Sequence, residues 1–335
     1  MKFRFYAVLH NMKLDNIKTK GKRINLDEYR ARITNSSGEF KKILQNPETN
    51  ERIGFHSANE FLADNTTYVY IDGELENIIS FEEMNTIGLG FSFSLLRKIQ
   101  YLTHYLWTVK DNNIYVRDGF LIVYENNFRD VGTYKASVSA INSTADNFRD
   151  VISTFSDEEL NRAVSTMEEN LFDPDSEENN DNKRELIESK YPTPEVFYES
   201  EGSNRYIRAF FFTIAARSQG ILSLKIVFYI NALECLFSIS RNKITHNVAE
   251  RAASLVKNTI IERDELYKKI KKAYNVRSRI VHGDPLNNNE DELAEMSKVL
   301  DNLLRNILLE HKNFFEEDTE KKLADKFEQL VSQEL

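Results

Sequence analysis

The sequence predicts an α+β domain followed by an all-α helical bundle. Short runs of aromatic and β-branched residues mark the first 150 residues. Helical periodicity dominates from residue 204 onward. Only 11 of the 335 residues are glycine and 5 are proline, which is too few for a fold built of many tight turns. These observations argue against an all-β chain and favour two domains of different class.

The first domain is expected to contain a sheet and one clear helix. Turn-forming Asn, Asp and Gly residues separate four runs of strand character: 2–9, 66–72, 113–124 and 133–141. Leucine, isoleucine and tryptophan recur near the 3.6-residue period from Phe93 to Trp107. A helix-start pattern at Ser156 predicts a further helix over 156–172. The expected domain spans residues 1–172, and we expect it to act as a sensor or a regulatory part.

An acidic connection is expected between the domains. Residues 157–201 hold 15 Asp and Glu against 4 Lys and Arg, and the stretch 173–183 contains no apolar residue. A segment of this composition cannot bury a core and is typical of a solvated linker. We place the linker at residues 173–203.

The second domain, residues 204–335, is expected to be a bundle of helices. Helical periodicity predicts six segments: 204–219, 222–240, 247–258, 261–282, 289–313 and 316–333. Gly220, the polar residues after Ile239 and the Gly283-Asp-Pro285 stretch supply breaks. The segment 289–313 carries one apolar stripe, which a bundle or a second copy of the chain could cover equally well.

The amino-acid composition restricts which partners the chain can bind and in which cellular compartment we expect it. The net charge of -9 argues against a generally basic nucleic-acid coat or a binder of anionic membranes, so any nucleic-acid site must be local. A single cysteine, Cys235, allows no intramolecular disulfide and no cysteine-based zinc site, as is usual in a reducing cytosol. The chain shows no apolar stretch typical of a signal peptide or membrane span. We expect a cytoplasmic protein that needs no metal, cofactor or membrane.

The end of the predicted helix 261–282 holds the main candidate for chemistry. Common phosphate-loop, serine-hydrolase, zinc-protease and calcium-loop motifs do not occur in the sequence. Arg277 and His282 precede a Gly-Asp-Pro stop. Cations in a last helical turn complement the helix dipole, and glycine forms the usual left-handed end. The spacing alone therefore favours a structural interpretation of this pair.

Four ordered segments nevertheless resemble the ApeA-like family of the HEPN superfamily. They lie on successive predicted helices: Tyr206-Ile-Arg208, then 228–237, 249–253 and 274–283. The last contains an Arg-X4-His motif formed by Arg277 and His282. The resemblance covers about residues 204–313, and residues 1–170 resemble no family.

The resemblance implies a helical domain that dimerises and cleaves RNA without a metal. Two Arg-X4-His motifs then face each other across the two-fold axis, with Arg277 and His282 as the catalytic pair. Glu234 matches an acidic residue that lies near the family's site and orients it. Ser278 stands where many members have Asn, Asp or His. Members of the family commonly act in bacterial defence against phages or as toxins, which implies a phage-derived or nucleotide trigger sensed by the first domain.

These residue types suit cleavage of RNA by its own 2′-hydroxyl. An imidazole can accept and donate protons near neutral pH, and a guanidinium binds phosphate oxygens in a fork. In a regular helix five positions correspond to about 140° of rotation, so Arg277 and His282 do not share a face. Arg279 is closer to His282 in angle. The choice of Arg277 therefore rests on the resemblance.

Local charge favours an anionic ligand near this motif. Residues 241–285 hold 11 Lys and Arg against 5 Asp and Glu. A solvated helix face explains the densest part of this run equally well. The RNA-binding candidates are Lys268, Lys269, Lys271 and Lys272.

Glu234 has a structural interpretation beside the site-orienting one. A buried carboxylate needs a cationic or hydrogen-bonding partner in either case. A partner on a neighbouring helix, such as Arg205, Arg208 or Arg251, is compatible with a purely structural role.

The sequence therefore predicts a homodimeric, metal-independent endoribonuclease that acts as a defence or toxin effector. The alternative is a catalytically inactive HEPN-like dimer that binds RNA or a nucleotide, or that serves as a scaffold. A third interpretation is a monomeric helical adaptor in which Arg277 and His282 are buried and form the motif by chance.

Overall fold

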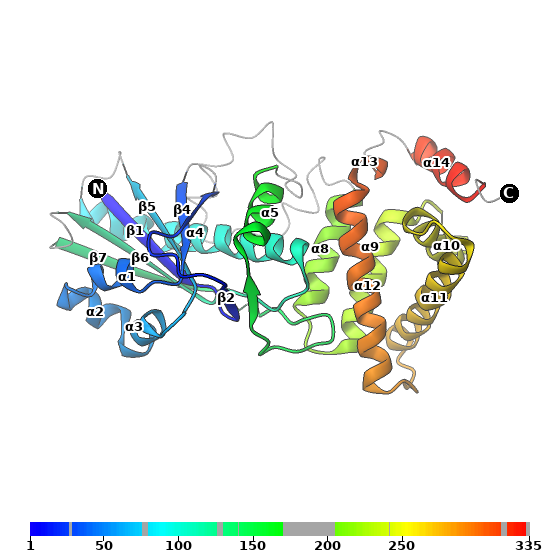
Figure 1. Ribbon diagram of the computed structural model, residues 1–335, viewed down its shortest axis with the longest axis horizontal. Coiled ribbons are helices and arrows are strands. Elements are labelled where there is room, and N and C mark those ends of the chain that lie inside the picture. The colour runs from blue at the N-terminus through cyan, green and yellow to red at the C-terminus, as the bar shows by residue number, and fades with distance from the viewer. Residues whose placement is uncertain are drawn as a thin grey trace. The chain divides into compact units, whose positions relative to one another are not determined.

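In the computed structural model the chain divides into two compact units (Figure 1). The structure describes residues 1–26, 29–75, 80–125, 130–139, 141–169, 205–240, 242–315 and 320–332. Within these ranges the first unit contains 1–142 and 150–169, and the second contains 143–149 and 205–332. The expected linker 173–203 lies outside the described residues.

The first unit is built on a six-stranded antiparallel sheet with strand order β3-β4-β5-β1-β6-β7. Its strands are β1 Lys2–Val8, β3 Lys22–Leu26, β4 Tyr29–Thr34, β5 Tyr68–Glu74, β6 Asp118–Glu125 and β7 Asp130–Ser137. Two short strands, β2 Met12–Leu14 and β8 Ser153–Phe155, pair in parallel beside it. The α+β class expected for this half is confirmed.

Helices cover parts of both faces of this sheet (Figure 1). On one face α4, Phe81–Val109, packs on Phe3 and Phe5 of β1, and α5, Asp157–Glu168, packs against α4 in the same core. On the other face Tyr6 of β1 packs against α1 Gly38–Ile43 and α3 Phe55–Leu62, and α2 Pro47–Ile53 lies in the same core. Successive side chains of a strand point to opposite faces, so β1 contributes to two cores.

The second unit is all helical, as expected. Its helices are α8 Arg205–Arg217, α9 Leu222–Phe237, α10 Ile244–Val256, α11 Ile260–His282, α12 Glu290–Glu310, α13 Lys312–Phe315 and α14 Glu320–Ser332. Side-chain caps begin two of the long helices, because Thr259 accepts from the amide of Glu262 and Asn289 from that of Glu292. These caps fix where α11 and α12 start.

A buried polar cluster joins α9 to α12. Asp301 of α12 is 0% exposed. Its Oδ1 accepts a 2.8 Å hydrogen bond from the hydroxyl of Tyr229 on α9, and its Oδ2 pairs with Arg305 one turn further along α12. A buried carboxylate is tolerated only when it is paired and hydrogen-bonded. The cluster therefore sets how α9 and α12 align.

Residues 143–149 belong to the second unit, although the expected boundary placed them in the first. The amide of Ser143 donates to the carbonyl of Arg217 over 2.9 Å, and its hydroxyl accepts a 2.9 Å hydrogen bond from Nζ of the buried Lys225. The hydroxyl of Ser297 on α12 donates to the carbonyl of Ala145 over 2.6 Å. The helical unit thus takes hydrogen-bond partners from a segment far away in the sequence.

Two boundaries in the first unit differ from the prediction. The strand expected over 113–124 begins only at Asp118, because the side chain of Asn112 accepts from the amide of Ile114 and forms a local turn. The helix expected over 93–107 begins earlier, at Phe81, where Ser80 caps its first turn. In the described parts of the chain no helix combines the length and the apolar character needed to cross a bilayer.

Candidate active site

The C-terminal end of α11 is regular helix as far as His282. Gly283 follows with φ of 78°, in the left-handed region that glycine adopts without strain. The amide of Asp284 then donates to the carbonyl of Arg279 over 2.8 Å, which closes the helix end. Since no turn relaxes before Gly283, Arg277 and His282 stay about 140° apart around the helix axis.

Arg277 faces α9 and pairs with Glu234. Its Nη2 lies 3.6 Å from Oε2 of Glu234. The Arg277 side chain is 32% exposed and that of Glu234 is 25% exposed, so the pair is half-buried and open to solvent on one side. The Nε of Arg277 is buried without a hydrogen-bond partner among the described residues, but the side chain as a whole stays partly open to solvent, and a guanidinium that reaches solvent can grip a phosphate.

Two of the alternative partners considered for Glu234 bind backbone instead. Arg205 donates to the carbonyls of Leu236 and Ser238 over 3.2 and 3.1 Å. Arg251 donates to the carbonyl of Phe237 over 2.6 Å. Both arginines therefore satisfy carbonyls at the C-terminal end of α9, whereas Arg277 forms an ion pair with Glu234.

Tyr274 completes this cluster and was not among the residues predicted for the site. It precedes Arg277 by three positions on α11 and is 6% exposed. Burial, together with the negative charge of Glu234, raises the pKa of the Tyr274 phenol. The phenol therefore remains protonated beside the carboxylate. Its position one turn before Arg277 was a usable sequence signal.

His282 lies on another face of α11, together with lysines. It is exposed. Eleven helical positions separate it from Lys271, which corresponds to a residual angle of only about 20°. Lys268 lies within about 40° of it by the same geometry. A single copy of the chain therefore presents the imidazole on a basic face and the guanidinium on the face toward α9.

The four lysines predicted to contact RNA are all exposed, but they differ in their surroundings. Lys268 forms an ion pair with Asp264 one turn earlier. The ammonium of Lys271 lies 5.2 Å from the ring centroid of Tyr267. Lys269 and Lys272 are exposed on the same helix. The predicted contacts thus line α11 without converging on Arg277.

Ser278 and Arg279 take positions that differ from Arg277. Ser278 is exposed. Nη1 of Arg279 donates a 2.8 Å hydrogen bond to the carbonyl of Pro285. Arg279 therefore fastens the chain that follows α11, so its closeness in angle to His282 has a structural explanation.

Two apolar side chains adjoin the Arg277 face, one of them exposed and the other half-buried. Val281 follows Arg277 by one turn, within about 40° around the axis, and is 55% exposed. Ile280 is half-buried. An apolar surface beside two polar candidate residues is suited to being covered by another protein surface.

In its described residues, the same unit meets the requirements of neither a cysteine nucleophile nor a metal site. Burial raises the pKa of the Cys235 thiol to about 11, so the nucleophilic thiolate is scarce at neutral pH. Across the described ranges, no three His, Cys, Asp or Glu side chains are grouped as a metal site would require.

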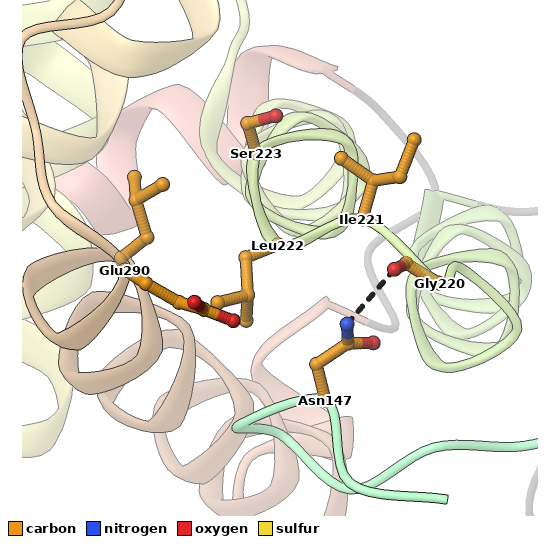
Figure 2. A pocket seen from close by; sticks show the side chains of 7 residues that line it. Asn147, Gly220, Ile221, Leu222, Ser223 and Glu290 are labelled. Atoms are coloured by element: carbon orange, nitrogen blue, oxygen red, sulfur yellow. Dashed lines mark hydrogen bonds between the residues drawn. The ribbon is translucent and has the colours of Figure 1, made fainter.

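A separate hollow lies where α9 and α12 begin (Figure 2). Asn147 closes one side of it and donates a 2.8 Å hydrogen bond to the carbonyl of Gly220. The one ionisable residue in its lining is Glu290, and a carboxylate repels a phosphate. None of the predicted site residues lines this hollow. Its lining residues are Asn147, Gly220, Ile221, Leu222, Ser223, Glu290 and Leu293.

Comparisons with protein-family models, with curated proteins and with solved structures found no match for this chain.

Proposed function

We propose that this chain is a metal-independent endoribonuclease whose active unit is a homodimer. The observation that supports this proposal most directly is that Arg277 and His282 both reach the surface at the end of α11, on faces about 140° apart. One copy does not direct both side chains at the same phosphate. Two copies related by a two-fold axis can supply a guanidinium from one chain and an imidazole from the other. The exposed Val281 and the half-buried Ile280 are suited to that interface.

The chemistry is a transesterification within the RNA. One imidazole accepts the proton of the 2′-hydroxyl, whose oxygen attacks the adjacent phosphorus. The bond from phosphorus to the 5′-oxygen breaks, and the second imidazole donates a proton to that leaving oxygen. The guanidinium of Arg277 stabilises the added negative charge on the phosphoryl oxygens, and Glu234 orients it. The products are a 2′,3′-cyclic phosphate and a 5′-hydroxyl.

The biological role that follows is that of a defence or toxin effector in the cytoplasm. A nuclease that cuts cellular RNA has to remain inactive until it is needed. The first unit has cores of its own, so it is available as a sensor. Its trigger in this proposal is a phage component or a nucleotide.

One observation favours the alternative of an inactive dimer that binds RNA or a nucleotide. Arg277 already has an anionic neighbour in Glu234, and Ser278 offers only a hydroxyl at the next position. An arginine held in this way can contribute to binding without stabilising a transition state. Such a module would hold RNA and leave it intact.

Subunit mixing tests the composite site. We expect co-expressed wild-type and His282→Ala chains, in equal amounts, to retain about a quarter of the wild-type activity, because only dimers with two intact imidazoles cut efficiently. A matched mixture with His56→Ala, which replaces an exposed histidine of the first unit, should retain full activity. Light scattering on the same samples should report a dimer.

Two results would contradict the composite site even if the chain cuts RNA. One is an equal mixture of wild-type and His282→Ala chains that retains half of the wild-type cleavage activity. The other is a fully active monomer in sedimentation.

A further inference from the structure

Three arginines lie together on one face of the sheet in the first unit, at the edge formed by β3 and β4. Arg23 of β3 is directly opposite Arg32 of β4, and Arg30 lies two residues before Arg32. Cross-strand partners and alternate residues of a strand share a face. Arg23 and Arg30 are exposed and Arg32 is half-buried. We call Arg23, Arg30 and Arg32 the edge arginines.

The edge arginines stand out against the charge of the whole chain. Residues 18–32 hold six Lys and Arg against two acidic residues, Asp27 and Glu28, in a chain of net charge -9. The two acidic residues lie outside the described residues. Like charges directly opposite each other on neighbouring strands destabilise a sheet. The pairing of Arg23 with Arg32 therefore has a cost that a bound anion would remove.

The acidic neighbours of this face have partners of their own. Asp72, which lies opposite Arg30 on β5, is bound by Arg4, whose Nη2 lies 2.9 Å from Oδ2. Glu74 pairs with Lys2 over 3.5 Å. In the described part of the chain, no ion pair joins an edge arginine to a carboxylate. Among the described residues, no carboxylate therefore neutralises the charge of the edge arginines.

Backbone contacts hold one of the edge arginines in place. The carbonyl of Lys20 accepts a 2.9 Å hydrogen bond from Nη1 of Arg32 and a 3.2 Å hydrogen bond from the hydroxyl of Tyr70. At the outer side of β3, Asn25 donates to Glu168 over 2.9 Å. Because the guanidinium of Arg32 is already held in place, it loses little conformational freedom when it binds an anion, which favours affinity for that anion.

We propose that the edge arginines bind the sugar-phosphate backbone of a single-stranded nucleic acid. Arg30 and Arg32 are alternate residues of β4, about 6.7 Å apart, and Arg23 lies across from Arg32 on β3, so the three guanidinium groups present separated positive charges around a bend at Arg32. A phosphodiester chain carries regularly spaced negative charges, and arginine forks fit phosphate oxygens. This surface belongs to the first unit, and the proposal does not depend on cleavage at the end of α11.

Fluorescence anisotropy on the full chain tests the proposal. The probes are labelled oligo(U) RNA and oligo(dT) DNA of about 20 nucleotides, longer than the footprint of one small binding domain. The His282→Ala background prevents loss of the RNA probe, while the DNA probe lacks the 2′-hydroxyl and needs no such protection. The test variant combines Arg23→Gln, Arg30→Gln and Arg32→Gln. A control variant combines Lys41→Gln, Arg52→Gln and Arg162→Gln, which removes the same charge from exposed positions elsewhere in the unit.

The edge variant should bind both probes at least about 10-fold more weakly, with the slope of log affinity against log salt reduced by about 2, because three phosphate contacts are lost. The control variant should lose much less affinity. An Arg-to-Lys version of the edge variant should recover most of the salt slope. The melting temperature of the edge variant without ligand should equal or exceed that of the unsubstituted chain, because like-charge repulsion is relieved.

Three outcomes would overturn the proposal: unchanged binding in the edge variant, an equal loss in the control, or displacement of the probes by polyglutamate at equal charge concentration. The last result would identify a general polyanion surface. Because the DNA probe reports on binding alone, these outcomes are distinguishable from a failure of the proposed ribonuclease.

Discussion

We expect His282→Ala to lower RNA cleavage by about 100-fold or more, because removal of a positioned acid or base typically costs 10²- to 10⁴-fold. The side chain is exposed at the end of α11, so the substitution leaves the bundle packed. The thermal transition should therefore remain where it is in the unsubstituted chain. His56→Ala serves as the matched control, since it removes an exposed imidazole from the first unit.

Arg277 should show the same loss for a different reason. Arg277→Ala removes the charge that stabilises the phosphoryl oxygens in the proposed mechanism, and Arg277→Lys keeps a point charge but loses the fork. We expect both variants to cut poorly and to remain dimeric by light scattering. Cleavage that persists in both His282→Ala and Arg277→Ala would remove the mechanism.

Asp301→Ala should cause a large loss of stability in the helical unit. The carboxylate is fully buried between Tyr229 and Arg305. Its removal leaves a mostly buried guanidinium and a buried hydroxyl without their acceptor, and breaking such a pair costs about 3 to 5 kcal/mol. Urea unfolding measures the change.

The control for Asp301 lies on the same helix. Glu295→Ala removes an exposed carboxylate of α12, and surface substitutions usually change stability by less than about 0.5 kcal/mol. A loss at Asp301 no larger than that at Glu295 contradicts the role given to the buried cluster. If Asp301→Ala loses stability by the expected amount but still cuts RNA at low temperature, the cluster supports the fold and not the chemistry.

The long helices could be predicted from the sequence because their apolar period and their ends agree. The expected 222–240, 261–282 and 289–313 correspond to α9, α11 and α12, which differ by a few residues at the termini. Caps and Gly283 give local signals that do not depend on tertiary contacts.

The short helices of the first unit were not predicted from the sequence. The helices α1 to α3 have six to eight residues each, which is too short for a period to show. The Asn46-Pro47 start of α2 was nevertheless a readable signal. The placement of residues 143–149 with the helical unit depends on hydrogen bonds across many positions in the sequence, which no local pattern contains.

The candidate site was only partly open to prediction. Arg277 and Glu234 were singled out from the resemblance, but their contact depends on how α11 packs against α9. The role of Arg279 depends on the carbonyl of Pro285, and that of Tyr274 on burial beside Glu234. Angular positions on α11 followed from helical geometry alone, and the regular helix to His282 keeps them.

The central claim is that the dimer cuts RNA by 2′-hydroxyl attack without a metal. The direct measurement is incubation of the purified chain with RNA in excess chelator, followed by analysis of the product ends. The account predicts cleavage that survives chelation, leaves a 2′,3′-cyclic phosphate and a 5′-hydroxyl, and stops when a 2′-deoxy nucleotide is placed at the cut. Intact RNA, or cleavage that requires a metal and leaves a 5′-phosphate, would contradict it.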